Sequence, residues 1–371
     1  MRFSSILGEA TRNLAGGTSR LAAWSLLAAA LIAVLAGYAA HQSAAQLRAA
    51  DEFVHDGGST YVLEAEGSVS GTACRALATH PDVVASGALR DRPDGLRARF
   101  LPSTPLPAFE AGPGFIDIFG SPDTPDTEAA RRPSGLALSA DAALTLGLHR
   151  GDHLDVVNSD GTIQTTSVDQ VYDFPDGSSL PALGYAAIST VPSSGTFDAC
   201  WLRATTAAAR PDSPVLALAR TALLGPDAGQ SQISQLNGRL GDTAPGPQTT
   251  SYAAGAGPSL LALVVGALLG TGMIQTRRLE LASALHLGAR RADLIQQHLI
   301  EAATKVVTGA IIAAPIVIYL AVDGVPGPST ALPLLAGTKT VTALVAGVLL
   351  GTGTRAATVR ESDLYAYFRE R

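Results

Sequence analysis

Few polar side chains in this sequence stand at the spacings that catalytic or metal sites require. His149 and His153 flank the tripeptide 150–152, and this spacing could hold a metal ion if a third ligand came from elsewhere. The favoured interpretation is a solvated turn, and we interpret His55 beside Asp56 in the same way. The protease motif HExxH and the hydrolase motif GxSxG are absent from the sequence. We therefore expect no catalytic residue and no metal site.

Nucleotide binding through a phosphate-binding loop is also not expected. The sequence contains no GxxxxGK[ST] motif, and its nearest approach, Ala336–Thr340, lacks the leading glycine and lies in an apolar run. We expect that this chain is not an enzyme and binds no cofactor directly.

The elements that carry these residues are indicated by apolar runs. The 371-residue chain is 47% hydrophobic, with a mean hydropathy of +0.23, as a membrane protein with a large polar domain would be. Four runs are candidates: the first, 21–40, reaches the ~30 Å of a bilayer core at ~1.5 Å per residue, and the other three are near the lower length limit for a helix that crosses lipid. A cleaved signal peptide is the alternative for the first run, but that run exceeds the usual apolar length. The predicted order is a cytoplasmic segment (1–20), a first span (21–40), an extracytoplasmic domain (41–256), a second span (257–275), a cytoplasmic segment (276–304), a third span (305–322), an external turn (323–331), a fourth span (332–353) and a cytoplasmic tail (354–371).

Charge is distributed unevenly along the chain. Residues 41–256 hold 24 acidic residues against 13 arginines, a net charge of −11, and the remainder carries +5. This asymmetry argues against nucleic acid as a ligand of the middle block and fits a chain divided by a membrane.

Arginine sets the predicted orientation, because positive residues concentrate in cytoplasmic segments. Both termini are therefore expected in the cytoplasm and the acidic block outside. Lys305 and Lys339 are the only lysines, and this preference for arginine, with abundant alanine, suggests a GC-rich bacterial source. We expect the bacterial cell membrane. The arginines that decide the orientation are Arg2, Arg12, Arg20, Arg277, Arg278, Arg290, Arg291, Arg355, Arg360, Arg369 and Arg371.

The acidic block mixes strand and helix patterns and predicts an α+β domain. Alternation and apolar periodicity indicate two strand-helix-strand units at its ends, which we expect to form one layer. The predicted elements are strand 60–67, helix 70–80 and strand 82–89 in the first unit, and strand 199–206, helix 213–224 and strand 230–237 in the second.

A β-rich insert separates these two units. The pattern predicts a helix at 139–146 and a hairpin of strands 153–157 and 162–172, with Asp160 and Gly161 in the turn. The proline-rich stretches 102–113 and 122–133 are expected to be irregular connections.

Two cysteines, Cys74 and Cys200, both fall in the domain assigned outside. An oxidising compartment favours a disulfide between them, which would join the two units. Two buried free thiols are the alternative.

The segment 276–302 lies between two apolar runs and carries four arginines. Its apolar residues follow helical spacing on both sides of Gly288, which predicts two helical pieces that meet at a glycine corner. Anchoring to lipid headgroups would explain the arginines, but not the paired amphipathic helices.

This segment and the order of spans resemble the FtsX/MacB-type (type VII) ABC transporter permeases. The outside insert has a weaker, MacB-like similarity in the helix and turn of 136–157. Residues of the segment that match the family motifs are Arg277, Glu280, Leu281, Leu287, Gly288, Ala289, Leu294, Leu299, Glu301 and Ala302, and those of the insert are Ala143, Leu146, Gly147, Gly151 and Asp152.

The resemblance implies a permease subunit without enzymatic activity of its own. Two such subunits, identical or paralogous, would bind two copies of a cytoplasmic ATPase that holds ATP and Mg²⁺. The segment between spans two and three would be the coupling helix, with Glu280 and Glu301 fixing its corner. His286 departs from the arginine often found beside that corner. The implied ATPase-coupling residues are Arg277, Arg278, Glu280, Leu285, His286, Gly288, Ala289, Arg290, Arg291 and Glu301.

Two functions are compatible with this resemblance. One is the export or extraction of a hydrophobic or amphipathic substrate by mechanical motion of the outside domain, which the size of that domain favours. The other is mechanotransmission, in which the same motion regulates an envelope enzyme and nothing is transported. A membrane scaffold without an ATPase is a third reading, and it would make the coupling segment a coincidence.

Overall fold

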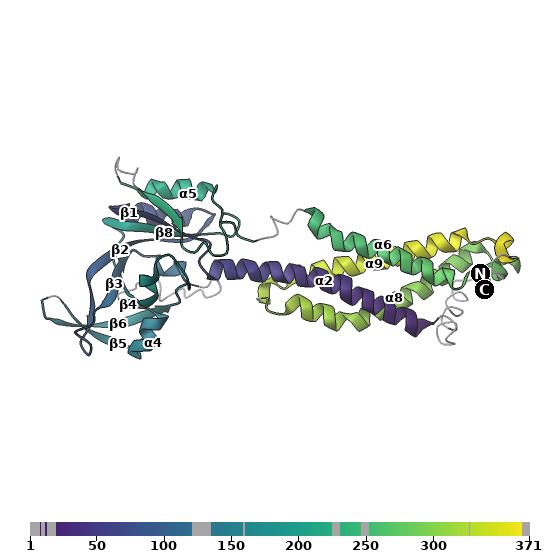
Figure 1. Ribbon diagram of the computed structural model, residues 1–371, viewed down its shortest axis with the longest axis horizontal. Coiled ribbons are helices and arrows are strands. Elements are labelled where there is room, and N and C mark those ends of the chain that lie inside the picture. Colours follow the sequence, from purple (N-terminus) through teal and green to yellow (C-terminus); the bar gives the residue numbers. More distant parts are fainter. Residues whose placement is uncertain are drawn as a thin grey trace. The chain divides into compact units, whose positions relative to one another are not determined.

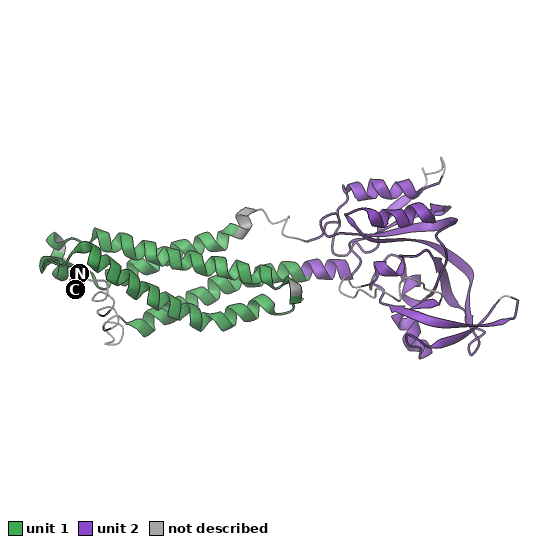
Figure 2. Cartoon of the chain, turned by 180° about the vertical axis from the view of Figure 1, so that it is seen from behind, with its two compact units in different colours: residues 1–48, 247–371 green, residues 49–246 purple. Residues whose placement is uncertain are grey.

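The computed structural model describes residues 20–120, 135–158, 160–224, 231–245, 252–325 and 327–365, together with Gly8 and Arg12. The chain divides into two compact units, coloured separately in Figure 2. Unit 1 comprises residues 1–48 and 247–371, and unit 2 comprises residues 49–246.

Four helices among the described residues are long and apolar enough to cross a membrane. They are α2 (Leu21–His55), α6 (Tyr252–Gln275), α8 (Arg291–Val322) and α9 (Ala331–Thr358), labelled in Figure 1. Helix α2 continues past the predicted span 21–40 to His55. Similarly, α8 begins at Arg291, inside the stretch expected to be a cytoplasmic connection. Apolarity marks the part of a helix that fits lipid, whereas the helix itself continues until its hydrogen bonding ends.

Glycines on α6 and α9 allow the two helices to approach each other closely. A Cβ atom added at Gly266 would lie 2.3 Å from the carbonyl oxygen of Leu344, and one at Gly351 would lie 2.0 Å from that of Ala267. Gly270 and Gly347 are equally tight. The two pairs, each with a spacing of four residues, form the small-residue interface by which helices associate in lipid.

We expect Gly351→Ala to destabilise unit 1 by about 1–3 kcal/mol, because the added methyl group must push two backbones apart. Gly353→Ala on the same helix is the matched control, since a Cβ atom there would lie 3.9 Å from Leu299 Cδ2. Thermal unfolding of both variants in mild detergent measures the difference. Equal melting temperatures would show that the helices do not touch at Gly351.

Unit 2 contains the two predicted strand-helix-strand units, which form one antiparallel layer. Its strands lie in the order β9-β1-β8-β2, which is the ferredoxin-like arrangement. Each predicted helix is a short α-helix followed by a 3-10 turn. The elements are β1 (Thr60–Ser70), α3 (Gly71–Ala76), β2 (Val83–Ala98), β8 (Thr196–Ala204), α5 (Pro214–Ala219) and β9 (Gln232–Gln235).

The insert closes a second sheet on itself. The far half of β2 pairs with β3 on one side and with β5 on the other, and the ring continues through β7, β4 and β6. Its interior is filled by apolar side chains that include Leu96, Leu138, Leu154 and Val168. The remaining elements of the insert are β3 (Leu106–Ala111), β4 (Leu136–Ser139), α4 (Ala140–Leu146), β5 (His153–Val157), β6 (Ile163–Tyr172) and β7 (Ala187–Thr190).

Two expectations for this region were wrong, and a third lies outside the described residues. The stretch 102–113, expected to be irregular, contains strand β3. Strand β2 does not end at Leu89 but continues to Ala98, through a register shift between Arg92 and Leu96 that accommodates Pro93 and a left-handed Gly95 (φ 62°). The stretch 122–133 falls in the part of the chain that is not described.

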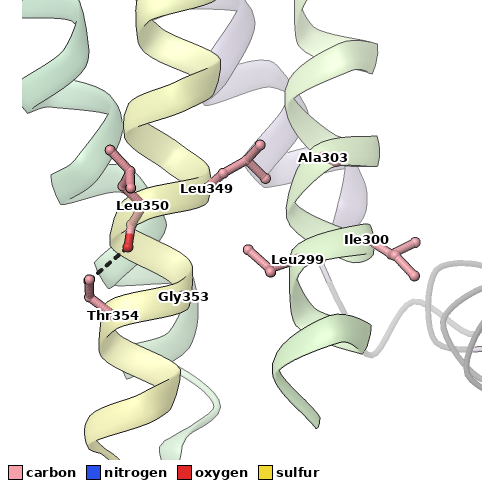
Figure 3. A pocket seen from close by; sticks show the side chains of 7 residues that line it. All are labelled: Leu299, Ile300, Ala303, Leu349, Leu350, Gly353 and Thr354. Atoms are coloured by element: carbon pink, nitrogen blue, oxygen red, sulfur yellow. Dashed lines mark hydrogen bonds between the residues drawn. The ribbon is translucent and has the colours of Figure 1, made fainter. Parts of the chain in front are cut away.

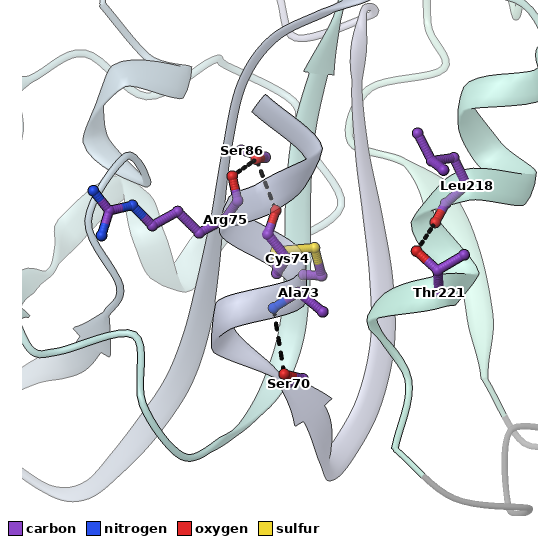
Figure 4. The surroundings of a disulfide bond; sticks show 8 residues. Ser70, Ala73, Cys74, Arg75, Ser86, Leu218 and Thr221 are labelled. Atoms are coloured by element: carbon purple, nitrogen blue, oxygen red, sulfur yellow. Dashed lines mark hydrogen bonds between the residues drawn. A yellow bond between two sulfur atoms is a disulfide. The ribbon is translucent and has the colours of Figure 1, made fainter. Parts of the chain in front are cut away.

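A disulfide joins the two strand-helix-strand units (Figure 4). It links Cys74 of α3 to Cys200 of β8, with their Cα atoms 5.7 Å apart and 126 positions between them in sequence. Both cysteines are fully buried in the core of the layer, and Ser86 Oγ donates a 2.8 Å hydrogen bond to the carbonyl oxygen of Cys74. The bond therefore closes a loop that contains the whole insert.

Removing this disulfide should destabilise unit 2 by about 2–4 kcal/mol, because the unfolded chain regains the conformations that the closed loop excludes. The variant is Cys74→Ala with Cys200→Ala, which leaves no buried thiol or hydroxyl unpaired. Its melting temperature should match that of the wild-type chain under reductant. Two thiols that react with an alkylating reagent in the unreduced, denatured protein would contradict the bond.

Candidate functional site

The segment between α6 and α8 forms a helix followed by a sharp turn. We call this turn, residues 285–290, the elbow. Helix α7 (Arg278–His286) ends where Gly288 adopts a left-handed conformation (φ 85°), which side chains disfavour. The amides of Gly288 and Ala289 donate to the carbonyl oxygens of Leu285 and Ala284, both at 3.0 Å. These bonds satisfy the carbonyls at the end of α7. The predicted glycine corner between two helical pieces is confirmed.

One face of this segment packs against the rest of unit 1. Leu281 and Ala282 of α7 are buried in a small apolar cluster with Ile274, Ala356 and Val359. These residues come from the ends of α6 and α9, so the elbow rests on both helices.

The opposite side of the elbow is exposed. Leu287 is 86% exposed, and its neighbours His286, Gly288 and Arg290 are exposed as well. Leu285 and Ala289 are half-buried beside them. The elbow therefore presents one large apolar side chain, with basic or titratable groups on both sides of it.

A buried ionic cluster fixes the N-terminal end of α7. Arg277 donates from Nε to Glu280 Oε2 at 2.7 Å and from Nη1 to Glu301 Oε2. Lys305 Nζ and His298 Nδ1 lie 3.8 Å and 3.9 Å from the same Glu301 oxygen. Glu301 is only 1% exposed, and a carboxylate removed from water must be paired. Arg277 thereby links the exit of α6 to α8.

The structure separates nine of the ten predicted coupling residues into two sets. Glu280 and Glu301 meet at Arg277, which lies at the start of α7 and not at Gly288. Arg278 is half-buried near that end. Leu285, His286, Gly288, Ala289 and Arg290 lie at the elbow itself.

Arg291 is engaged within the chain. Its Nη1 and Nη2 atoms donate to the carbonyl oxygens of Ala357 and Val359, both at 3.2 Å. These are among the last carbonyls of α9 and the residue after it, so Arg291 ties the start of α8 to the end of α9. We infer that its role is in the bundle.

Sequence reasoning missed three residues of this site. Leu287 was matched to a motif but not counted among the contact residues. His298 and Lys305 stand three residues before and four residues after Glu301, a spacing that places them on the same helix face. That spacing could have revealed both.

His149 and His153 lie at the turn that leads into β5. The amide of His149 donates to Asp152 Oδ2 at 2.7 Å, and its Nδ1 atom lies 3.6 Å from the same oxygen. Among the residues that the structure describes, no three potential ligands gather within reach of one ion.

Comparison with known proteins gives structural likenesses only. No protein-family model matches this sequence, and no curated protein matches it. One similar solved structure is the periplasmic region of MacB from Actinobacillus actinomycetemcomitans, at 8% identity and a TM-score of 0.33, over 50% of this chain and 92% of that one. Another is a domain of a putative permease from Porphyromonas gingivalis, at 15% identity and a TM-score of 0.32, over 52% of this chain and 95% of that one. Identities and TM-scores at this level establish neither a family nor a function for this chain.

Proposed function

We propose that this chain is the membrane permease subunit of an ABC transporter. It couples a separate cytoplasmic ATPase, which holds ATP and Mg²⁺, to motion of an extracytoplasmic domain. The observation that carries this proposal is the elbow at Gly288. Leu287 is exposed there, on a segment whose opposite face packs against the rest of unit 1. The motifs of 277–302 and the order of spans support the family assignment.

The contacts around the elbow connect the proposed ATPase contact to α8 and α9. A partner that binds Leu287 displaces α7. Because Arg277 at the start of α7 is paired with Glu301, the displacement is transmitted to α8. Arg291 connects the same end of α8 to α9. Because each link is a fixed contact between packed helices, the cytoplasmic ends move together. The energy must come from the partner, since a permease alone only redistributes its conformations.

The first helix connects the spans to the domain. Helix α2 runs without interruption to His55, and its last residues belong to unit 2. Within unit 2, Phe53 is fully buried against Ala209 and Ala244. A helix whose last residues are embedded in the domain suits mechanical transmission, which is compatible with two functions. We favour export or extraction of a hydrophobic or amphipathic substrate, and regulation of an envelope enzyme without transport is the second candidate.

The proposal predicts the composition of the purified complex. Tagged full-length protein, extracted in gentle detergent, should bring down an ABC ATPase subunit that mass spectrometry identifies and an ATP hydrolysis assay detects. Two permease subunits, identical or paralogous, should accompany two ATPase copies. An intact chain without any nucleotide-binding protein would indicate a scaffold or sensor and contradict the proposal.

A further inference from the structure

An apolar groove of 590 Å³ lies between α8 and α9 (Figure 3). Leu299 and Ile300 line it from α8, and Leu350, Gly353 and Thr354 line it from α9. The hydroxyl of Thr354 donates to the carbonyl oxygen of Leu350 at 2.8 Å, so it is already satisfied within the helix. The groove is thus suited to hydrocarbon.

The groove is open because of the residues on α9. Gly353 contributes no side chain between the helices, and the nearest heavy atom to a Cβ atom built there, Leu299 Cδ2, would lie 3.9 Å away. Leu350 is 59% exposed beside it. Both helices are apolar enough to span a membrane, and the groove lies where the predicted spans 305–322 and 332–353 meet their cytoplasmic segments, so it would face the headgroup end of the lipid tails.

Arginines gather where the same two helices approach the cytoplasm. The bonds from Arg291 to the carbonyl oxygens of Ala357 and Val359 hold the start of α8 against the end of α9. Arg290 and Arg360 flank this junction in sequence, and both are exposed. The groove and the arginines therefore belong to the same pair of helices.

Their separation matches the dimensions of a phospholipid. Arg291 and Leu299 are eight positions apart on α8, a rise of about 12 Å. On α9, four residues from Thr354 to Thr358 correspond to about 6 Å. A phosphate at the arginines would place the first carbons of an acyl chain at the groove. The carboxylates of Asp293 and Glu361 lie in the same stretches and reduce the positive charge without cancelling it.

We propose that the α8–α9 groove binds an anionic phospholipid of the cytoplasmic leaflet. One acyl chain fills the groove, and the phosphate lies between Arg290 and Arg360. Basic pockets between helices on the cytoplasmic side have the chemistry that recognises such headgroups. Lipid binding at this site does not require the ATPase partner, so its test is independent of the proposed function.

The test measures lipid retained by the full-length chain. The protein is reconstituted in vesicles of phosphatidylcholine and phosphatidylglycerol, extracted in mild detergent, washed and analysed for bound lipid by mass spectrometry. Wild-type protein should retain phosphatidylglycerol in preference to phosphatidylcholine. Leu350→Trp, which enlarges a side chain that lines the groove, should reduce that retention severalfold. Arg290→Gln with Arg360→Gln should remove the preference for the anionic lipid.

The matched control is Leu268→Trp on α6, a leucine that is 68% exposed. It adds the same side chain outside the groove and should retain lipid as the wild type does. Melting temperatures identify any variant that has merely failed to fold. Equal retention in all variants, or no preference in the wild type, would overturn the proposal. So would a self-associated state that Leu350→Trp disperses without loss of lipid, because a second copy would then be the occupant.

Discussion

Replacing Leu287 with aspartate should abolish stimulation of the partner ATPase, with little effect on the stability of the chain. Burying a leucine side chain at an interface contributes about 1.5–3 kcal/mol, and a buried, unpaired carboxylate adds a further cost. Because about 1.4 kcal/mol corresponds to a tenfold change in affinity, we expect the ATPase to bind at least tenfold more weakly. Titration of the purified ATPase against reconstituted permease, with ATP hydrolysis as the signal, measures this loss.

The control for this variant is Gln296→Asp, which places the same charge at an exposed position early in α8. It should leave stimulation near that of the wild type. Leu287 is almost fully exposed within the chain, so its replacement removes little packing and should not lower the melting temperature. Normal coupling in Leu287→Asp would reduce the elbow to a lipid anchor.

Replacing Glu301 with glutamine should destabilise unit 1 by about 3–5 kcal/mol, because a buried ion pair loses one partner. Arg277 and Lys305 would then be left without their shared carboxylate, and Lys305 is only 3% exposed. Thermal unfolding in detergent, with intrinsic fluorescence as the signal, measures the change. Stimulation of the ATPase should fall as well, because the link from α6 to α8 is broken.

A second substitution separates charge balance from packing. Lys305→Met removes one cation while it keeps a side chain of similar length, so Glu301→Gln with Lys305→Met should recover part of the lost stability. The double-mutant cycle gives the interaction energy of the pair. Strictly additive losses would show that Lys305 and Glu301 do not interact, and would contradict the cluster.

Elements whose signal lies in neighbouring residues were predictable from the sequence. The glycine corner was evident because left-handed backbone favours glycine and apolar periodicity stops at Gly288. The hairpin β5–β6 was evident from alternation on both sides of Asp160–Gly161, and helix α4 from the pattern of 139–146. Each of these signals lies within one continuous stretch of neighbouring residues.

Features that depend on distant partners were not predictable. Strand β3 lies in a proline-rich stretch whose local preference is irregular, and it becomes a strand because β2 and β7 pair with it on both sides. Closure of the ring needs β2 to reach β5, some sixty residues later, and no local pattern specifies that contact.

The ionic cluster also combines contacts that local spacing predicts with a contact that depends on a distant residue. His298 and Lys305 could have been assigned to Glu301 from helical spacing alone. Arg277 could not, because it lies 24 positions away on another element and meets Glu301 only when α6 and α8 fold together. The exposure of Leu287 likewise depends on how α7 packs against Ile274 and Val359 through Leu281 and Ala282.

The most direct test of this account is a contact measured at the elbow itself. A photo-cross-linking amino acid at position 287 of the full-length chain, activated in native membranes, should capture an ABC ATPase subunit that mass spectrometry identifies. The same group at position 224, a leucine that is 46% exposed on unit 2, should not capture it. Cross-links from position 287 to lipid alone, in membranes that contain the folded chain, would contradict the proposed coupling.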